Sequence, residues 1–296
     1  MGDLLGHRRP SPGAALRALL AGPEPLLAPG AYDGLSARLV EQAGFDAVYM
    51  TGFGTTASLI GRPDVGLLTG SEMVDNARRI VSAVDVPVIA DADTGYGNAI
   101  NVLRTVQLFE QAGVAGLQLE DQVAPKKCGH MSGKAVISTA EMVGKLEAAV
   151  AARRDPDLVV IARTDAVAVS GIEDAVARGR AYAEAGADVL FVEAPTSEDD
   201  IARVAGELAG VAPLVFNWAE GGRTPPLPLS RIAELGFSLV IYPIGTLLAA
   251  TAGMRALLAT LKADGVPPLA GLPAFDEFTD LVGLPEVQQL EQRFRG

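Results

Sequence analysis

Residues 86–97 have the sequence VPVIADADTGYG, an apolar run that ends in an acidic, glycine-containing loop. The apolar part, Val86–Ala92, has the length and composition of a strand buried on both faces, as in a parallel sheet. Helical patterns with one apolar face lie on either side of it, over Ser71–Val84 and Ile100–Ala112. The stretch therefore predicts a helix, a buried parallel strand and a second helix in succession.

The same unit recurs along the chain. The predicted strands are Leu26–Tyr32, Ala47–Gly52, Val86–Ala92, Ala115–Leu119, Leu158–Thr164, Val189–Glu193, Leu214–Asn217 and Leu239–Pro243. Further helical patterns cover Gly34–Ala43, Thr139–Arg153, Ile172–Ala185 and Ser197–Leu208. Eight strands that alternate with helices over about 250 residues predict an α/β fold, the (β/α)8 TIM barrel. The alternative, an open doubly wound sheet, is weakened because no G-x-G-x-x-G follows the first strand.

The C-terminal part of the chain differs from the barrel pattern. We predict a barrel core over residues 1–245 and C-terminal helices over residues 246–296. Two helical stretches, Thr246–Lys262 and Phe275–Phe294, are separated by the Pro/Gly-rich connector Gly265–Pro273. The residues leave open whether the last helix packs on a partner subunit or on its own barrel.

Composition excludes several classes of protein. The net charge of −12 argues against a nucleic-acid-binding surface, which would be basic. One cysteine, Cys128, excludes a disulfide framework, and two histidines, His7 and His130, exclude a His-rich metal site. The apolar runs are too short for a membrane helix, and the N-terminus lacks a convincing signal-peptide pattern. We expect a soluble, cytoplasmic protein that binds neither nucleic acid nor membrane.

Polar residues stand at the carboxyl ends of the predicted strands, where TIM barrels build their active sites. They include Asp91, Asp93, Glu120, Arg163, Glu193, Asn217 and Glu220. Asp91 and Asp93 are two residues apart, so in a strand they face the same way. Carboxylate ligands without a His or thiolate cluster suit Mg2+, with Mn2+ as a further possibility. The alternative is a pair of helix-capping aspartates, and the other charged residues expected at the same rim favour the metal.

The segment Lys126-Lys127-Cys128-Gly129-His130 follows the fourth predicted strand and contains the sole cysteine. Cationic neighbours lower the pKa of a thiol, so Cys128 can exchange a proton near neutral pH. Gly129 and Gly133 would let the segment move as a lid. The alternative is an exposed basic loop with an incidental cysteine.

Three motifs carry a resemblance to a known family: DADTGYG (91–97), EDQ (120–122) and KKCGH (126–130). With them, the chain resembles the isocitrate lyase/phosphoenolpyruvate mutase superfamily from residues 29–33 to Tyr242-Pro243. The resemblance implies a TIM barrel whose last helix swaps with a partner subunit in a dimer of dimers. It also implies Mg2+ near Asp91 and Asp93, held largely through water, with Asp64 and Glu120 nearby.

The resemblance assigns further roles to individual residues. Tyr32 and the Thr51-Gly52-Phe53 backbone would hold the 2-oxo or 2-hydroxy acid end of the substrate. Arg163 would bind its carboxylate, while Glu193, Asn217 and Glu220 would line the opposite wall. Lys126, Cys128, Gly129 and His130 would form a gating loop, with Cys128 protonating a carboxylate carbanion. Trp218 would either reshape the pocket around the distal group of the substrate or pack as a rim residue on the lid.

Departures within the superfamily bear on the substrate. The cysteine loop differs from the corresponding loops of other branches: phosphoenolpyruvate mutase and phosphonopyruvate hydrolase have asparagine there, and the oxaloacetate decarboxylase branch lacks this cysteine. Compared with the 2-methylisocitrate lyases, the chain has Met131 and Leu248 where they have arginine, and WAEGGRTP over residues 218–225. Leucine cannot pair with the extra carboxylate of a tricarboxylate. The EGGRTP form is closer to dimethylmalate lyase, the plant petal-death lyase, oxaloacetate hydrolase and carboxyphosphonoenolpyruvate phosphonomutase.

The expected function is therefore a Mg2+-dependent carbon–carbon lyase of the cysteine-loop branch. Its substrate would be a malate-type 2-hydroxy dicarboxylate similar to 2-methylisocitrate or 2,3-dimethylmalate, cleaved through an enolate-like anion to an α-oxo acid and a carboxylate. The alternatives are a carboxyphosphonoenolpyruvate phosphonomutase and an oxaloacetate hydrolase. A catalytically silent binding barrel is the alternative from another class, and the complete set of acidic and thiol residues speaks against it.

Overall fold

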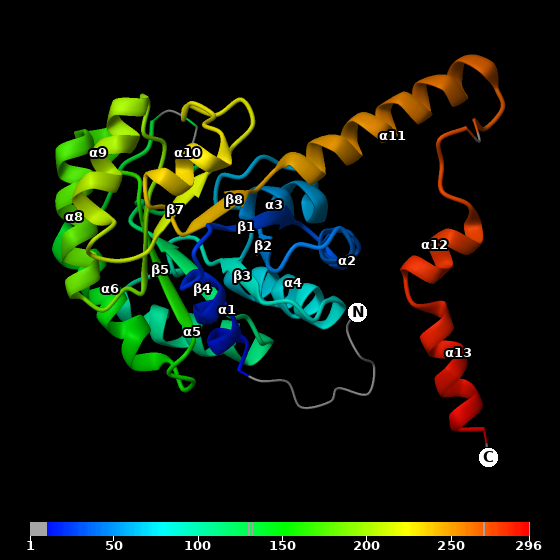
Figure 1. The fold of residues 1–296 in the computed structure, drawn as a ribbon, viewed down its shortest axis with the longest axis horizontal. Coiled ribbons are helices and arrows are strands. Elements are labelled where there is room, and N and C mark those ends of the chain that lie inside the picture. The colour runs from blue at the N-terminus through cyan, green and yellow to red at the C-terminus, as the bar shows by residue number, and fades with distance from the viewer. Residues whose placement is uncertain (1–10, 130, 132, 269, 296) are drawn as a thin grey trace.

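A computed structural model describes residues 11–129, 131, 133–268 and 270–295. Eight parallel strands close into a barrel in sequence order, and β8 pairs back with β1 (Figure 1). The strands are β1 Leu26–Ala31, β2 Val48–Met50, β3 Val88–Asp91, β4 Gly116–Glu120, β5 Val159–Thr164, β6 Val189–Val192, β7 Leu214–Asn217 and β8 Leu239–Tyr242. The predicted TIM barrel is confirmed.

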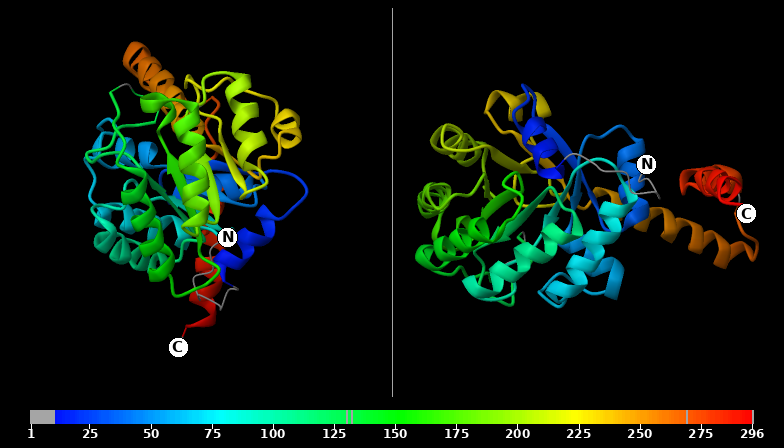
Figure 2. Two further views of the ribbon diagram at one scale, coloured as in Figure 1. Left: turned by 90° about the vertical axis from the view of Figure 1, so that its left-hand side faces the viewer. Right: turned by 90° about the horizontal axis from the view of Figure 1, so that it is seen from below.

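Helices surround the barrel and continue beyond it (Figure 2). In the described residues they are α1 Pro12–Leu20, α2 Gly34–Gln42, α3 Gly52–Ile60, α4 Gly70–Ala83, α5 Ala99–Ala112, α6 Thr139–Ala152, α7 Val167–Ser170, α8 Ile172–Glu184, α9 Glu198–Leu208, α10 Leu229–Glu234, α11 Gly245–Asp264, α12 Phe275–Leu281 and α13 Leu284–Arg293. Helices α1, α3, α7 and α10 were not predicted. Helix α3 begins directly after β2 because the Thr51 hydroxyl accepts a hydrogen bond from the Gly54 backbone N–H at 3.2 Å, as an N-cap does.

The strands are apolar at nearly every position because one apolar layer fills the barrel and a second lies between the sheet and the helices. Val159 and Ile161 of β5 belong to the cluster that fills the barrel, whereas Val160 and Ala162 belong to the layer between sheet and helices. Successive strand residues point to opposite faces, so a strand with both faces covered needs apolar residues at every position.

The closure between β1 and β8 depends on one glycine. A Cβ atom at Gly30 would lie 2.0 Å from the backbone carbonyl oxygen of Pro243, far inside van der Waals contact. We expect Gly30→Ala to lower the free energy of unfolding by about 3 kcal/mol, because the backbone must shift to admit the methyl group. Urea denaturation of the variant and the wild type measures this difference.

Gly144, in α6, provides the matched control, because a Cβ atom there meets nothing within 4 Å. Gly144→Ala should raise the free energy of unfolding by about 0.5–1 kcal/mol through the higher helix propensity of alanine. A Gly30→Ala variant as stable as the wild type would contradict the close approach of β1 to β8.

The C-terminal region extends away from the barrel (Figure 1). Helices α11, α12 and α13 contain no buried residue, and Phe275 and Phe294 are 85% and 64% exposed. The single helix expected over Phe275–Phe294 is two helices, because Gly283 adopts a φ of 92° between them. Arg38 and Gln42 of α2 donate hydrogen bonds to the Leu281 carbonyl, each at 3.4 Å. The packing of the last helix on a partner subunit stays a prediction, and so does the domain boundary at residue 245.

Candidate active site

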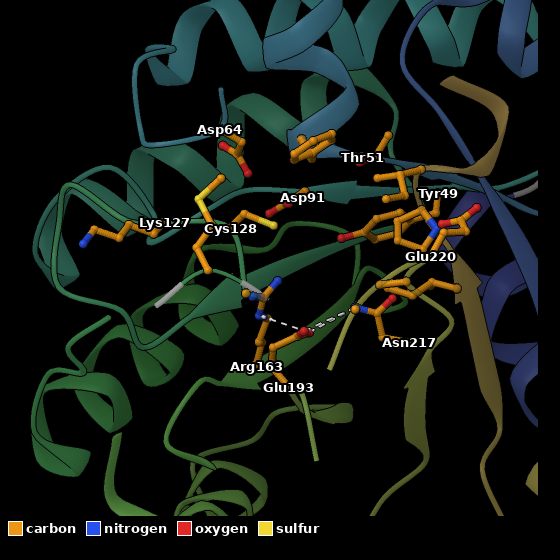
Figure 3. A pocket seen from close by; sticks show the side chains of 18 of the residues that line it. Tyr49, Thr51, Asp64, Asp91, Lys127, Cys128, Arg163, Glu193, Asn217 and Glu220 are labelled. Carbon is orange, nitrogen blue, oxygen red and sulfur yellow. Dashed lines mark hydrogen bonds and ion pairs between the residues drawn. The ribbon is translucent and has the colours of Figure 1, made fainter. Parts of the chain in front are cut away.

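A cavity of about 280 Å³ opens at the carboxyl ends of the strands (Figure 3). Several residues predicted from the sequence line it together: Thr51, Phe53, Asp64, Asp91, Lys126, Cys128, Gly129, Arg163, Glu193, Asn217 and Glu220. They come from the ends of different strands, from the N-terminus of α3, and from the loops after α3, β4 and β7. The barrel therefore brings these segments, far apart in sequence, to one cavity.

Lys126 lies in the acidic part of this cavity. Its ammonium Nζ is 2.7 Å from Asp64 Oδ2 and 2.8 Å from Asp93 Oδ1, and all three side chains are buried. Burial opposes the charge of Lys126, but Asp93, Glu120, Asp91 and Asp64 outweigh it and raise the pKa of Lys126 well above its usual value. The lysine is thus a permanent cation among carboxylates, and the alternative of an exposed basic loop is wrong at this position.

The loop that carries Asp91 and Asp93 is held in an uncommon backbone conformation. Asp93 and Tyr96 have φ angles of 49° and 60°, in the left-handed region that few residues other than glycine adopt. The Asp93 backbone N–H donates to Asp91 Oδ1 at 3.0 Å. The Lys145 ammonium donates to the Thr94 carbonyl at 3.1 Å, so α6 supports the loop. Such strained backbone is concentrated at functional sites.

The donor set fits a hydrated divalent cation. Glu120 Oε1 is buried without a hydrogen-bond partner, and burial together with Asp93 raises the pKa of Asp91 to about 6. Within the described part of the chain, no three His, Cys, Asp or Glu side chains converge as a closed metal cage. Mg2+ does not require such a cage, because it keeps several waters and binds through one or two carboxylates. Asp91 and Asp93, with Asp64 and Glu120 nearby, are suited to this kind of binding.

Arg163, at the end of β5, is fixed by buried carboxylates. Its Nε lies 2.9 Å from Asp165 Oδ2 and its Nη2 lies 3.1 Å from Asp165 Oδ1. Nη1 is 3.3 Å from Glu120 Oε2, and Nε is 3.8 Å from Glu193 Oε2. Burial opposes the charge of Arg163, but Asp165, Glu120 and Glu193 raise its pKa well above its usual value. The guanidinium is a fixed cation that a substrate carboxylate can approach.

Asn217 and Glu220 form the opposite wall of the cavity. Asn217 Nδ2 donates to Glu193 Oε2 at 3.2 Å, so the two side chains orient each other (Figure 3). Both carboxylate oxygens of Glu220 are buried, and the hydrogen bond between this carboxylate and the Tyr242 hydroxyl raises the pKa of Tyr242. Asn217 and Glu220 both line the cavity, and a carboxylate can accept more than one hydrogen bond, so Glu220 can also contact a ligand.

The loop after β4 is folded over the cavity. The Cys128 backbone N–H donates to the Asp64 carbonyl at 3.1 Å, and the side chain of Cys128 is half-buried. A Cβ atom at Gly129 would lie 2.3 Å from Arg163 Nη2 and 2.7 Å from Glu193 Cδ. Only glycine can pack so closely at this position. Gly129 of the Cys128 segment is thus packed against Arg163 and Glu193.

Other predicted residues lie away from the cavity lining. Tyr32 is not among the residues that line the cavity, and its backbone carbonyl accepts a hydrogen bond from Asn76 Nδ2 at 3.0 Å. A Cβ atom at Gly52 would lie 2.6 Å from Asp91 Oδ2. This glycine therefore allows α3 to approach the acidic cluster, which consists of Asp64, Asp91, Asp93 and Glu120. Asp93 and Glu120 are buried beneath the lining, in contact with Lys126 and Arg163. His130 is outside the described residues.

Trp218 lines an adjoining cavity of about 540 Å³, which shares the segment from Ala219 to Gly222 with the first cavity. Its indole Nε1 donates to the Leu227 carbonyl at 3.0 Å. This bond holds the indole ring against the segment that contains Leu227. Its role in substrate binding stays a prediction.

Tyr49, Gln118 and Lys134 were missed from the sequence. The Tyr49 hydroxyl donates to Gln118 Oε1 at 3.2 Å, and Gln118 Nε2 is 3.5 Å from Asp91 Oδ1. Tyr49 in β2 and Gln118 in β4 face the barrel interior. A polar residue at an inward position of an apolar strand is the signal that could have identified them.

The geometry is shared with a known family. Residues 16–262 match the family model described as phosphoenolpyruvate phosphomutase. The chain belongs to this family. It is 48% identical to a 2,3-dimethylmalate lyase of Eubacterium barkeri, over 95% of this chain and 97% of that protein. It is 46% identical to a carboxyvinyl-carboxyphosphonate phosphorylmutase of Arabidopsis thaliana (91% and 80% covered) and 44% identical to a 2-methylisocitrate lyase of Aeropyrum pernix (94% and 89% covered).

Solved structures of family members have the same fold. A crystal structure of 2,3-dimethylmalate lyase matches with a TM-score of 0.92 at 42% identity, over 98% of this chain and 97% of that one. Oxaloacetate acetylhydrolase with 3,3-difluorooxalacetate matches at 0.90 and 40% identity (95% and 96% covered). Phosphonopyruvate hydrolase with oxalate and Mg2+ matches at 0.87 and 36% identity (96% and 99% covered). The predicted superfamily is confirmed, and the relatives named as lyases agree with the predicted class of enzyme.

Proposed function

We propose that this family member is a Mg2+-dependent carbon–carbon lyase. It cleaves a substituted malate-type 2-hydroxy dicarboxylate, such as 2,3-dimethylmalate, to an α-oxo acid and a carboxylate. The observation that carries the proposal is that Cys128 and Arg163 line one cavity together with Asp64 and Asp91. The similarity to a 2,3-dimethylmalate lyase over nearly the whole chain supports this substrate class.

The cavity provides polar groups for both ends of such a substrate. Arg163 presents a buried guanidinium, whose planar donors match a carboxylate. The amide of Asn217 and the α3 N-terminus at Thr51 and Gly52 supply uncharged hydrogen-bond donors at the rim. A dicarboxylate is thus held between a fixed cation and polar groups.

The reaction moves one proton from oxygen to carbon. The 2-hydroxyl group loses its proton to a base, the C2–C3 bond breaks, and C2 becomes the carbonyl carbon of the α-oxo acid; the protonated base and the Cys128 thiolate left after the reaction return to their starting states by exchange with water. The electron pair of that bond stays on C3, as the enolate-like anion of the second carboxylate, and the Cys128 thiol donates a proton to this carbon. Mg2+ held by Asp91 and Asp93, with Asp64 and Glu120 nearby, would stabilise negative charge on the substrate oxygens. Closure of the loop over the bound substrate would limit the access of water, which would otherwise protonate the anion before Cys128 does.

The assignment of Asp91 to the cation predicts a change in the Mg2+ response. Asp91→Ala is expected to raise the Mg2+ concentration for half-maximal activity by roughly tenfold or more, because a carboxylate near the ion is lost. Asp75→Ala is the matched control, since Asp75 is exposed and pairs with Arg78 on the outer face of α4. An unchanged Mg2+ titration for Asp91→Ala would contradict the metal assignment.

A mass-spectrometric product screen tests the proposed function. Purified protein with Mg2+ is incubated with 2-methylisocitrate, isocitrate, 2,3-dimethylmalate, 2-ethyl-3-methylmalate and oxaloacetate. An α-oxo acid from one of the malates supports the lyase and identifies the substituent. Oxalate and acetate from oxaloacetate would identify a hydrolase instead. No product from the whole panel would contradict the lyase and direct the search to the phosphonomutase reaction.

Location and assembly remain predictions. No helix in the described residues is long and apolar enough to span a membrane. We propose a cytoplasmic homo-oligomer, a dimer of dimers, in which the exposed apolar residues of α11 to α13 contact a partner subunit. Analytical ultracentrifugation of the full chain measures this state.

A further inference from the structure

Lys134 is a buried cation that the reaction outlined above does not use. It lies between the Cys128 segment and α6, and its side chain is only 1% exposed. The Nζ atom donates to Asp165 Oδ1 at 2.7 Å and also to the Gly129 backbone carbonyl. A buried ammonium needs such partners, because burying an unpaired charge is costly. Lys134 therefore connects the loop over the cavity with the end of β5.

Asp165, the partner of Lys134, is rigidly attached to the barrel. Its backbone N–H donates to Asp121 Oδ1 at 2.9 Å. Asp121 Oδ2 in turn accepts hydrogen bonds from the hydroxyls of Thr164 and Tyr182, both at 2.7 Å. The carboxylate of Asp165 is thus a fixed point, and it also holds Arg163 through two hydrogen bonds.

We propose that Lys134 is a positioning residue that couples closure of the Cys128 loop to the orientation of Arg163. An ammonium has three donors, so it can bind the Gly129 carbonyl and the Asp165 carboxylate at once. When the loop is closed, both bonds form and Gly129 rests against Arg163. When the loop opens, the bond to Gly129 is lost. The importance of this coupling for turnover rests on the proposed function, but the coupling itself does not.

The sole cysteine makes loop opening measurable without turnover. Alkylation of Cys128 by iodoacetamide, followed by the mass of the intact protein, reports how often the half-buried thiol becomes accessible. Lys134→Met is expected to accelerate alkylation roughly tenfold, as the loss of one hydrogen bond to a charged group shifts an equilibrium. Lys262→Met, which removes an exposed lysine of α11, is the charge-matched control and should leave the rate unchanged.

The direction of the change in the alkylation rate distinguishes the proposal from a purely electrostatic role of Lys134. Removing a nearby cation raises the pKa of a thiol and would by itself slow its alkylation. A rate equal to or below that of the wild type would therefore overturn the proposal. Lys134→Arg, which keeps the charge and donors, should alkylate more slowly than Lys134→Met and serves as the folded variant if the methionine destabilises the chain.

A double-mutant cycle tests the link to Asp165. Asp165→Asn should also accelerate alkylation, and the double variant Lys134→Met/Asp165→Asn should alkylate no faster than the faster single variant. Multiplication of the two effects would show that the residues act independently and would overturn the coupling. Because alkylation needs no substrate, failure of the lyase assay leaves this test intact.

Discussion

Cys128→Ser is expected to lower kcat by about 10³-fold, within the usual contribution of a general acid. A serine hydroxyl is a far weaker acid than a thiol, so it cannot protonate the carbanion at a comparable rate. The substitution is nearly isosteric and leaves the loop contacts of the backbone, such as the bond from the Cys128 N–H to the Asp64 carbonyl, in place. Steady-state kinetics on the substrate found in the product screen measures the loss.

Binding provides the control for this variant. Oxalate with Mg2+ should raise the melting temperature of Cys128→Ser as much as that of the wild type, because the acidic cluster and Arg163 are untouched. A variant with wild-type kcat would remove Cys128 as the acid. A variant that no longer responds to oxalate would show that the substitution damages the site rather than the proton transfer.

Arg163→Lys is expected to lower kcat/KM by about 10³-fold, although the positive charge is kept. The guanidinium bonds Asp165 through Nε and Nη2 and faces Glu120 through Nη1, a fork that one ammonium cannot reproduce. A lysine there would either leave Asp165 or fail to meet the substrate carboxylate. Each lost charge-assisted hydrogen bond costs about 1.5–3 kcal/mol, so the loss of two such bonds accounts for a decrease of about 10³-fold in kcat/KM.

Arg203→Lys is the matched control for Arg163→Lys. Arg203 pairs with Glu173 and Glu207 on the outer helices and is 42% exposed. Exposed pairs contribute about 0–1 kcal/mol, so this variant should keep its activity and most of its stability. If Arg163→Lys retained wild-type kcat/KM, the guanidinium would not be the group that binds the substrate carboxylate.

The barrel could be predicted because its pattern is local. Strands buried on both faces, such as Val159–Thr164, are apolar at nearly every position, and the helices between them have one apolar face. Helix α3 escaped prediction because its sequence, GFGTTASLI, has no clear helical period, and a single cap at Thr51 starts it. The helix break at Gly283 depends on one residue in a left-handed conformation, within a sequence that otherwise favours a helix.

The site was only partly predictable, for a physical reason. Asp91, Glu120 and Arg163 stand at strand ends, so barrel topology alone gathers them. Asp64 came only from the family resemblance, and its place in the site depends on its ion pair with Lys126. Lys134 could not be identified, because its role depends on the loop folding back onto β5, a tertiary contact without a sequence pattern.

The most direct measurement is product analysis with 2,3-dimethylmalate, Mg2+ and the 296-residue chain. The proposed reaction yields pyruvate and propionate in equal amounts, because breaking the C2–C3 bond divides the six carbons of the substrate into three and three. Omission of Mg2+ in the presence of a chelator should remove both products together. Pyruvate without propionate, or neither product from this or any other malate of the panel, would contradict the assignment of a carbon–carbon lyase.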